Sequence, residues 1–286
     1  MDFQSLFEQF LNGGGATQAS MYRSLALFLP EIILSGAIVL TLLARLTSLD
    51  KVLPIHWITL FGGMTAFLNV LFQFWELSMD GGHATSLFTG LAVHDSFSVF
   101  FRGLLLFFLL FVVALAVLTG IPDREDSPDF YVMLSGAVIG MMLMSSASHL
   151  LMLFVGLEMA SVPSYALTGF LKGRRQSSEA ALKFVVYGAG AAGVLLYGIS
   201  LIAGLTGTAE FSELGDRLHG LFLNGFGTRY LEARIMLLAL LMIVVGFAFK
   251  LSVVPFHFWC PDAFQGASAE VAGFLSIGSK AAAFAL

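Results

Sequence analysis

The sequence is short of charged residues and contains a single cysteine. Asp, Glu, Lys and Arg make up 12% of its 286 residues, whereas soluble domains carry roughly 25%. This low charge excludes a water-soluble globular enzyme and a disordered protein. The 14 basic residues form no patch and the net charge is −5, which excludes a nucleic-acid-binding protein. Because Cys260 stands alone, an intrachain disulfide and a cysteine-rich metal or cluster site are excluded as well.

Hydrophobic residues, by contrast, make up 58% of the chain, and the mean hydropathy is +0.89. A membrane helix needs about 20 apolar residues, and the sequence contains eight runs of that kind. They cover residues 24–46, 52–76, 97–119, 130–148, 149–171, 179–206, 231–259 and 268–286. The sequence therefore predicts an all-α polytopic membrane protein, with a polar surface segment at 1–23 and the first three transmembrane helices within 24–128.

The segments between the runs indicate how the chain crosses the membrane. The fourth and fifth runs nearly abut around Ser145–His149, which predicts a tight hairpin, and residues 211–221 of the longest late loop suit a short helix on the membrane surface. Six Lys or Arg residues lie in the loops on one side, with Lys172–Arg175 as the main cluster, against four or five on the other. By the positive-inside rule, the N-terminus lies outside the cytoplasm. Leu286 lies within an apolar run, so we expect the natural protein to continue beyond it.

Four charged side chains lie well inside the apolar runs: Glu158, Lys183, Lys250 and Lys280. A Lys, Arg or Asp at the centre of a span costs about 2.5–3.5 kcal/mol on insertion scales. We therefore expect these groups to face a polar interior, to pair with one another and to pass a proton along the row. Alternatively, a single lysine can extend its ammonium to the membrane–water interface. This alternative suits Lys183 best, because Lys183 lies one turn from Glu179 at the beginning of its run. For Glu158 the alternative is a protonated carboxyl in a helix contact.

The seventh run contains a proline close to its lysine. In Phe247-Ala-Phe-Lys250-Leu-Ser-Val-Val-Pro255-Phe-His257 the proline follows the lysine by five residues. Proline lacks an N–H and clashes with the preceding turn, so the pattern predicts a helix broken at Pro255. Lys250 and His257 are seven residues apart, about 700° of rotation, which places them on nearly the same face of an unbroken helix. His257 is a candidate proton relay because histidine titrates near neutrality; a plain packing role is the alternative.

Other patterns predict packing or anchoring. Gly188-Ala-Gly190-Ala-Ala-Gly193 matches the dinucleotide-binding pattern, but it lies inside an apolar helical run. Without a preceding strand or a following acidic residue, we interpret it as a helix-packing surface. Arg102 and Glu31 lie just inside the third and first runs, and we interpret them as interfacial anchors, with a functional role as the alternative. The remaining histidines show no metal-ligand spacing, and no nucleophile–base constellation is present.

Three motifs, in order, resemble the antiporter-like subunits of respiratory complex I. They are Gly156-Leu-Glu158-Met-Ala-Ser161-Val-Pro163-Ser-Tyr165, then Ser178-Glu-Ala-Ala-Leu-Lys183-Phe, and then Gly246-Phe-Ala-Phe-Lys250-Leu-Ser-Val-Val-Pro255-Phe-His257-Phe-Trp-Cys-Pro261-Asp262. The tyrosine motif after the glutamate, and Asp262-Ala-Phe-Gln-Gly266, favour the subunit N family of NADH-quinone oxidoreductases over the sister subunits L and M. The resemblance covers nearly the whole chain and is strongest over 150–286.

The resemblance implies the antiporter-like fold, a fourteen-helix proton channel made of two inverted five-helix repeats that each contain a broken helix. Residues 129–286 would form the first repeat, and the sequence stops before the second. By position, the resemblance implies that Glu158 pairs with Lys250, that Lys280 is the central lysine of the eighth helix and that His257 is the bridging histidine. Lys183 matches a lysine that the sixth helix of this subunit type often carries.

For function, the resemblance implies a proton-translocating membrane-arm subunit of NADH:quinone oxidoreductase in the bacterial inner membrane. Its expected neighbours are the lipid bilayer and subunits of the A, H, J, K, L and M types. No metal and no cofactor is expected in this chain, because FMN, the iron–sulfur clusters and the quinone belong to partner subunits. Two alternatives stay open. One is a subunit of a multi-subunit cation/proton antiporter or membrane-bound hydrogenase, and the other is a non-conducting scaffold.

Overall fold

The computed structural model describes residues 21–49, 54–79, 81–123, 126–225 and 230–286, so most of the predicted surface segment at 1–23 lies outside it. Helices make up almost all of its regular structure. They are α2 (Met21–Leu27), α3 (Leu29–Leu46), α4 (His56–Met79), α5 (Ser96–Thr119), α6 (Ser127–Ser145), α7 (Leu150–Thr168), α8 (Arg175–Thr206), α9 (Phe211–Gly225), α10 (Tyr230–Lys250), α11 (Trp259–Gly266) and α12 (Ala269–Ala285). The all-α membrane fold predicted from the apolar runs is confirmed.

Seven of these helices are long and apolar enough to cross a membrane, namely α3 to α8 and α10. The eighth predicted run corresponds to α12, which has 17 residues. The first run is divided at Phe28, because Pro30 lies at the beginning of α3 and cannot continue the preceding helix. The helix expected in the longest late loop is α9, and the connection at 146–149 between α6 and α7 is as short as predicted.

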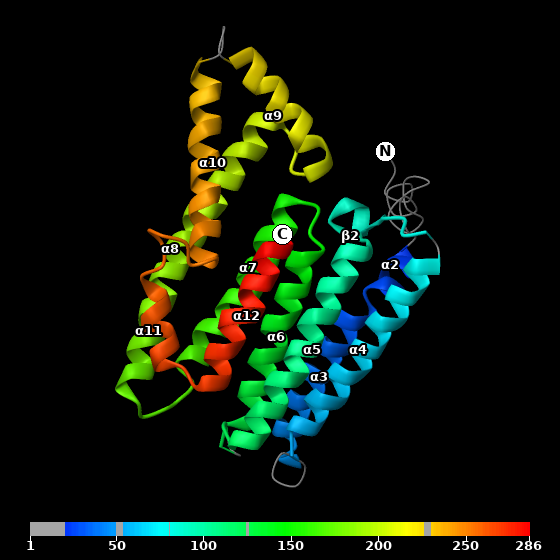
Figure 1. Ribbon diagram of the computed structural model, residues 1–286, viewed down its shortest axis with the longest axis vertical. Coiled ribbons are helices and arrows are strands. Elements are labelled where there is room, and N and C mark those ends of the chain that lie inside the picture. The colour runs from blue at the N-terminus through cyan, green and yellow to red at the C-terminus, as the bar shows by residue number, and fades with distance from the viewer. Residues whose placement is uncertain (1–20, 50–53, 80, 124–125, 226–229) are drawn as a thin grey trace.

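Four helices, α3 to α6, run side by side and form one half of the bundle (Figure 1). The most buried is α6, since 72% of the residues in its apolar stretch are buried. It packs most closely on α7. A Cβ atom at Gly140 of α6 would lie 2.6 Å from the Met159 backbone of α7. Only a glycine lets the two helix backbones approach this closely, as in other membrane helix pairs. This contact holds α7, the helix that carries Glu158, against the most buried helix of the bundle.

On the other flank, α8 and α10 lie against each other and α9 joins them at the end beyond the bundle (Figure 1). Gly188 supports the packing interpretation of its motif, since a Cβ atom there would collide with the Tyr165 hydroxyl of α7. Gly190 and Gly193 face open space, so they make no close helix contact within the described part of the chain. The motif therefore acts through one glycine rather than through all three.

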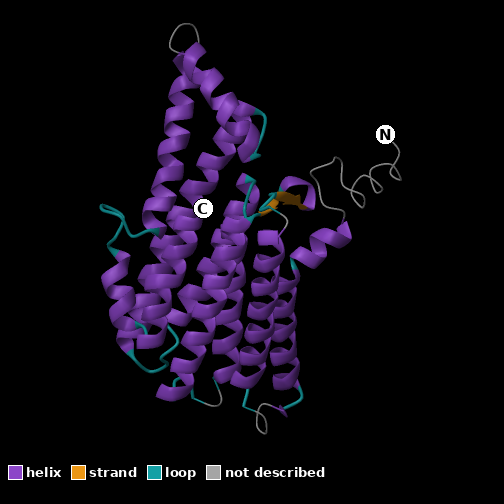
Figure 2. Cartoon of the chain, turned by 45° about the vertical axis from the view of Figure 1, so that its right-hand side comes forward, coloured by secondary structure: helices purple, strands orange, loops and turns teal. Residues whose placement is uncertain are grey.

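A short antiparallel hairpin closes one end of the bundle (Figure 2). Strands β1 (Thr85–Leu87) and β2 (Ala92–His94) pair with Thr85 opposite His94 and Leu87 opposite Ala92. Strand β2 runs directly into α5, whose first turn is capped by Asp95 in a reciprocal capping box with Ser98. The hairpin is thus rigidly connected to the third membrane helix.

The break in the seventh run begins earlier than predicted. Helix α10 ends at Lys250, and the residues from Leu251 to Phe258 form turns with Ser252 in the left-handed region (φ 58°). The prediction that Lys250 and His257 share a face of one helix is therefore wrong. The physical reason is that Pro255 clashes with the carbonyl of the residue four before it and disfavours helical backbone at the residue before it. The helix consequently ends a full turn ahead of the proline.

Candidate functional site

Lys250 is the last residue of α10 and the most deeply buried lysine among the described residues, with 6% of its surface exposed. Its ammonium nitrogen Nζ donates a hydrogen bond to Ser161 Oγ of α7 at 2.9 Å. Ser161, itself 2% exposed, donates its own proton to the Leu157 carbonyl at 2.6 Å. Its oxygen lone pair is thereby directed at the lysine. A single serine is thus the hydrogen-bond acceptor of a buried cation.

Glu158 lies on α7 one turn before Ser161 and is half-buried. Its carboxylate and the Lys250 ammonium act on each other electrostatically. Within the described structure, however, Lys250 donates to Ser161 rather than to Glu158, and Glu158 Oε1 is buried without a hydrogen-bond partner. The expected direct pair is therefore replaced by a charge interaction across a gap, because Lys250 reaches α7 one turn beyond the glutamate.

Lys280 of α12 lies among aromatic rings. Its Nζ is 5.4 Å from the centre of the Trp259 ring and 5.2 Å from that of Phe264, both on α11. The charge of Lys280 also acts on Lys250. Ring faces attract a cation with about 0.5–2 kcal/mol. The indole of Trp259 is fixed in turn by a hydrogen bond from its nitrogen to the Phe249 carbonyl at 3.1 Å. The short helix after the break therefore supplies the surroundings of this lysine.

His257 lies in the turns between α10 and α11 and is half-buried. Its ring stacks on Phe258 with 4.9 Å between ring centres. Its Nδ1 is buried without a hydrogen-bond partner in the described structure. The histidine is near the break but makes no direct bond to Lys250 or Lys280 there. A bridging role for it requires water.

Lys183 belongs to a more exposed group. It forms ion pairs with Glu179 at 2.9 Å and with Asp262 of α11 at 2.8 Å, and its side chain is 39% exposed. These residues line a polar cavity of about 210 Å³ together with Gln176 and Gln265. Lys183 was predicted to belong to the row of relay residues, whereas no role was predicted for Asp262. The only signal in the sequence for a role of Asp262 was its position just after the helix break. That position did not identify Lys183 of α8 as its partner.

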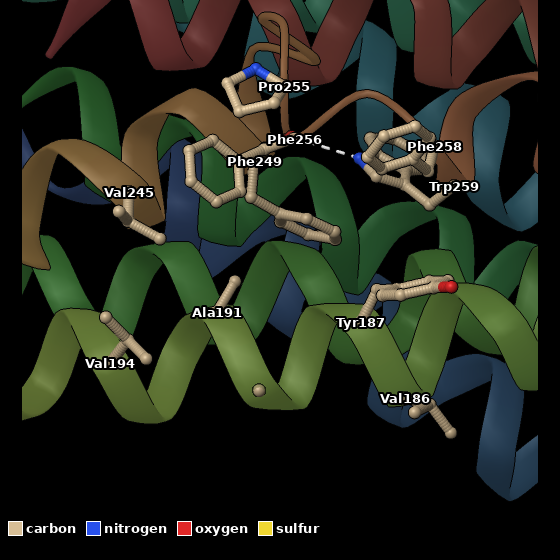
Figure 3. A pocket seen from close by; sticks show the side chains of 11 residues that line it. Val186, Tyr187, Ala191, Val194, Val245, Phe249, Pro255, Phe256, Phe258 and Trp259 are labelled. Atoms are coloured by element: carbon tan, nitrogen blue, oxygen red, sulfur yellow. Dashed lines mark hydrogen bonds between the residues drawn. The ribbon is translucent and has the colours of Figure 1, made fainter.

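An apolar cavity of about 350 Å³ lies between α8, α10 and the break (Figure 3). It is lined by side chains of α8 and α10 and by Pro255, Phe256, Phe258 and Trp259. No ionisable side chain except the phenol of Tyr187 lines it, so it is not the place where the lysines meet. Within the described residues, no three His, Cys, Asp or Glu side chains gather as metal ligands.

From the sequence, Glu31 and Arg102 were predicted to be interfacial anchors, and this prediction is wrong because both are buried. Their side chains are 1% and 0% exposed, and Arg102 Nε lies 3.0 Å from Glu31 Oε1. The interpretation failed because α2 and the hairpin cover the ends of α3 and α5, which sequence alone does not reveal. The available signal was the opposite charge of two residues near the beginnings of helices that could lie side by side.

Comparisons with known proteins show which family this chain resembles. Residues 147–286 match the family described as NADH:quinone oxidoreductase/Mrp antiporter, transmembrane. The chain is 40% identical over 215 residues to NADH-quinone oxidoreductase subunit N of Anaeromyxobacter sp. (strain Fw109-5), covering 73% of this chain and 40% of that protein. It is 37% identical over 275 residues to subunit N 1 of Koribacter versatilis (strain Ellin345), covering 91% of this chain and 51% of that protein.

Among solved structures, a chain of respiratory complex I from Thermus thermophilus with bound aureothin superposes with a TM-score of 0.69 at 32% identity. The match covers 90% of this chain and 52% of that one. A chain of an archaeal membrane-bound sulfane sulfur reductase superposes with a TM-score of 0.65 at 19% identity, which shows a shared fold alone. The chain spans about half the length of the relatives it matches.

Proposed function

Because the chain belongs to the subunit N family of NADH-quinone oxidoreductases, we propose that it carries protons through the membrane arm of such a complex. The observation that carries the proposal is Lys250, a cation buried to 6% exposure whose hydrogen bond goes to one serine. An ionisable group at that depth is a functional group by default, since its cost in the membrane must be offset. The bacterial inner membrane, with the N-terminus on the periplasmic side, is the proposed location.

The proposed relay runs from Glu158 to Lys250 and on to Lys280. Two unit charges 4 Å apart interact by about 4 kcal/mol at an effective dielectric constant of 20. Each 1.36 kcal/mol changes a proton-binding equilibrium tenfold. A change of charge on either side of Lys250 is therefore large enough to make it release or take up a proton. The electrostatic influence of both Glu158 and Lys280 on Lys250 supports this order.

Water would complete the path. His257 lies in the break and its Nδ1 lacks a partner in the described structure, while Lys280 lies beside Trp259 and Phe264 of the helix that follows the break. Freed polar groups at membrane depth are tolerated where they line a wet cavity. We place Lys183, with its two carboxylate partners, at the edge of the relay rather than in its centre, because its side chain is 39% exposed.

The redox chemistry belongs to other subunits in this proposal. FMN, the iron–sulfur clusters and the quinone would be held by partner subunits, and this chain would contact membrane subunits of the A, H, J, K, L and M types. The driving event here is a movement of charge near Glu158, transmitted to Lys250. The chain itself would hold no cofactor.

The test is to measure proton pumping per assembled complex after substitution of Lys250. Lys250→Ala removes the charge and is expected to abolish most pumping. Lys250→Arg keeps a cation that cannot be deprotonated in a protein, and it is expected to pump poorly as well. Lys172→Ala is the matched control, because Lys172 forms an ion pair with Asp126 at 2.5 Å while its side chain is 72% exposed. Normal pumping by either Lys250 variant would refute the relay and leave the non-conducting scaffold.

A further inference from the structure

A fully buried ion pair joins the first and third membrane helices at a distance from the lysine row. Besides its contact with Glu31, Arg102 donates a hydrogen bond from Nη1 to the Leu27 carbonyl at 3.3 Å. The Leu27 carbonyl also accepts from Gln73 Nε2 of α4 at 3.2 Å. Residues 147–286 are the part that matches the family model, so this pair lies outside it. The proposed relay does not use these charges.

Strand β2 contributes His94 to the same cluster. Its side chain is 2% exposed and lies close enough to Arg102 for the guanidinium charge to act on it. Apart from the contact between Arg102 Nε and Glu31 Oε1, several buried polar atoms of the cluster have no hydrogen-bond partner in the described structure: Glu31 Oε2, Arg102 Nη2, His94 Nδ1 and Gln73 Oε1. Such atoms are normally satisfied by ordered water. The cluster therefore differs from a self-contained structural ion pair.

From this cluster, a continuous set of backbone hydrogen bonds leads to α7. Val93 N donates to the Ser146 carbonyl at 2.8 Å, and Ser148 N donates to the Leu91 carbonyl at 3.1 Å. Ser148 Oγ adds a bond to the Gly90 carbonyl at 2.7 Å. Residues 146–148 are thus hydrogen-bonded to the hairpin in the way that one antiparallel strand is bonded to the next. Two residues later α7 begins, the helix that carries Glu158 and Ser161.

We propose that Arg102 and Glu31 are positioning residues: the buried pair fixes the hairpin, and the hairpin fixes the beginning of α7 so that Glu158 and Ser161 stay beside Lys250. This inference rests on the proposed function for its effect on transport, but the attachment itself is independent of transport. Arg102 is coupled to β2 because only Asp95 separates His94 from α5. Loss of its charge would leave the Glu31 carboxylate buried alone, which is strongly unfavourable. The ends of α3 and α5 would then separate to admit water.

The attachment can be measured by disulfide trapping between positions 92 and 147, because Ala92 and Ala147 face each other in an isolated antiparallel bridge. The hydrogen bonds on either side of this pair make it the closer kind of antiparallel pair, with Cα atoms about 4.5 Å apart, within the range for a disulfide. The double variant Ala92→Cys and Ala147→Cys is made in the full complex with Cys260→Ser, which removes the single cysteine of these 286 residues. We expect Arg102→Met to slow disulfide formation about fivefold, because the two cysteines would then face each other about one fifth as often. An unchanged rate would overturn the attachment.

Arg45→Met is the matched control. Arg45 of α3 also pairs with a carboxylate on another helix, Asp129 of α6, but the two side chains are 44% and 35% exposed. Exposed pairs contribute little, so its trapping rate should equal that of the parent. Arg102→Lys keeps the charge without the forked geometry and should restore part of the rate. If Arg102→Met fails to assemble, Arg102→Lys and Glu31→Gln carry the same comparison.

The effect on transport is measured with the same complexes. Reduced Arg102→Met complex should pump about fivefold less per assembled complex, and oxidation of the two introduced cysteines to their disulfide should restore pumping. A merely structural role would lower the amount of complex without this rescue. Slower trapping with normal pumping, or reduced pumping that the disulfide does not restore, would overturn the positioning role. If the proposed function is wrong, Lys250→Ala will pump normally. If only the positioning role is wrong, Lys250→Ala will still lose pumping, so the two outcomes can be distinguished.

Discussion

Removal of one oxygen atom is the sharpest test of the buried lysine. Within the described residues, Ser161 Oγ is the hydrogen-bond acceptor of Lys250, at 2.9 Å, and Ser161→Ala deletes it. A hydrogen bond to a charged group contributes about 1.5–3 kcal/mol. The charged lysine loses that stabilisation, whereas the neutral lysine loses less. Where this free energy enters the slowest proton transfer, the rate falls about tenfold or more, since each 1.36 kcal/mol is a factor of ten.

The assay is NADH-driven acidification of inverted membrane vesicles, divided by the amount of assembled complex. Ser164→Ala is the matched control, because Ser164 lies one turn further along α7, is 1% exposed and makes the same bond to a helix carbonyl at 2.6 Å. Ser161 makes that bond at 2.6 Å too, so both variants lose it, and only Ser161→Ala loses the contact with Lys250. Equal pumping in the two variants would refute the assignment of Ser161 as the partner of the relay lysine.

Three further predictions concern stability, each read from thermal unfolding of the purified complex. Arg102→Met should destabilise by about 3–5 kcal/mol by leaving a buried carboxylate unpaired, and Arg45→Met by less than about 1 kcal/mol; equal effects would contradict the burial argument. Burial, and then the charge of Arg102, lower the pKa of His94 to about 4. Below pH 6.5 the unfolded chain therefore binds a proton that the folded chain does not, which costs about 2 kcal/mol at pH 5. His94→Gln should remove this acid sensitivity, and an unchanged difference between pH 7 and pH 5 would refute it. Gly188→Ala should cost about 1–3 kcal/mol by overpacking against its tyrosine neighbour, whereas Gly190→Ala, which faces open space, should be tolerated; the reverse order would contradict the packing interpretation.

The helices were predictable because the membrane leaves few choices. A run of about 20 apolar residues must satisfy its own backbone groups, so it forms a helix wherever it crosses the bilayer. The predicted runs 97–119 and 179–206 correspond to α5 (Ser96–Thr119) and α8 (Arg175–Thr206), within four residues at each end. The extra turn at the beginning of α8 is polar, and hydropathy gives no sign of it. Local composition thus determines which segments are helical but not where a polar extension begins.

The contacts of the charged residues were predicted less well. That Glu158, Lys250 and Lys280 lie near one another follows from their place in the apolar runs, but the partner of Lys250 does not. The glutamate and the serine are three residues apart on α7, and which of them meets the lysine depends on how α10 packs against α7. The direct ion pair was implied by the resemblance, which matches residues by position along the chain. A position along the chain does not give the relative height of two packed helices, so the hydrogen bond to Ser161 was not foreseen.

The burial of Arg102 and Glu31 shows the same limit in another form. Each lies near a helix end, where single-sequence reasoning assigns charges to the interface. Whether a helix end reaches water depends on what covers it, here α2 and the β1–β2 hairpin. The hairpin segment contains no long apolar run, so hydropathy treats it as a plain loop. The pair was thus invisible until the tertiary contacts were known.

The early end of α10 also explains how Lys250 can carry charge without a direct carboxylate partner. As the last residue of the helix, it belongs to the C-terminal turn, whose end bears roughly half a negative charge. A cation at this position gains about 0.3–1 kcal/mol at an exposed helix end and up to about 2 kcal/mol when partly buried. In a helix that continued to Pro255, the C-terminal end and its negative charge would lie about a turn beyond the lysine. The proline therefore does more than bend the seventh helix: by ending it at Lys250, it supplies part of the electrostatic stabilisation that a distant Glu158 supplies only across a gap.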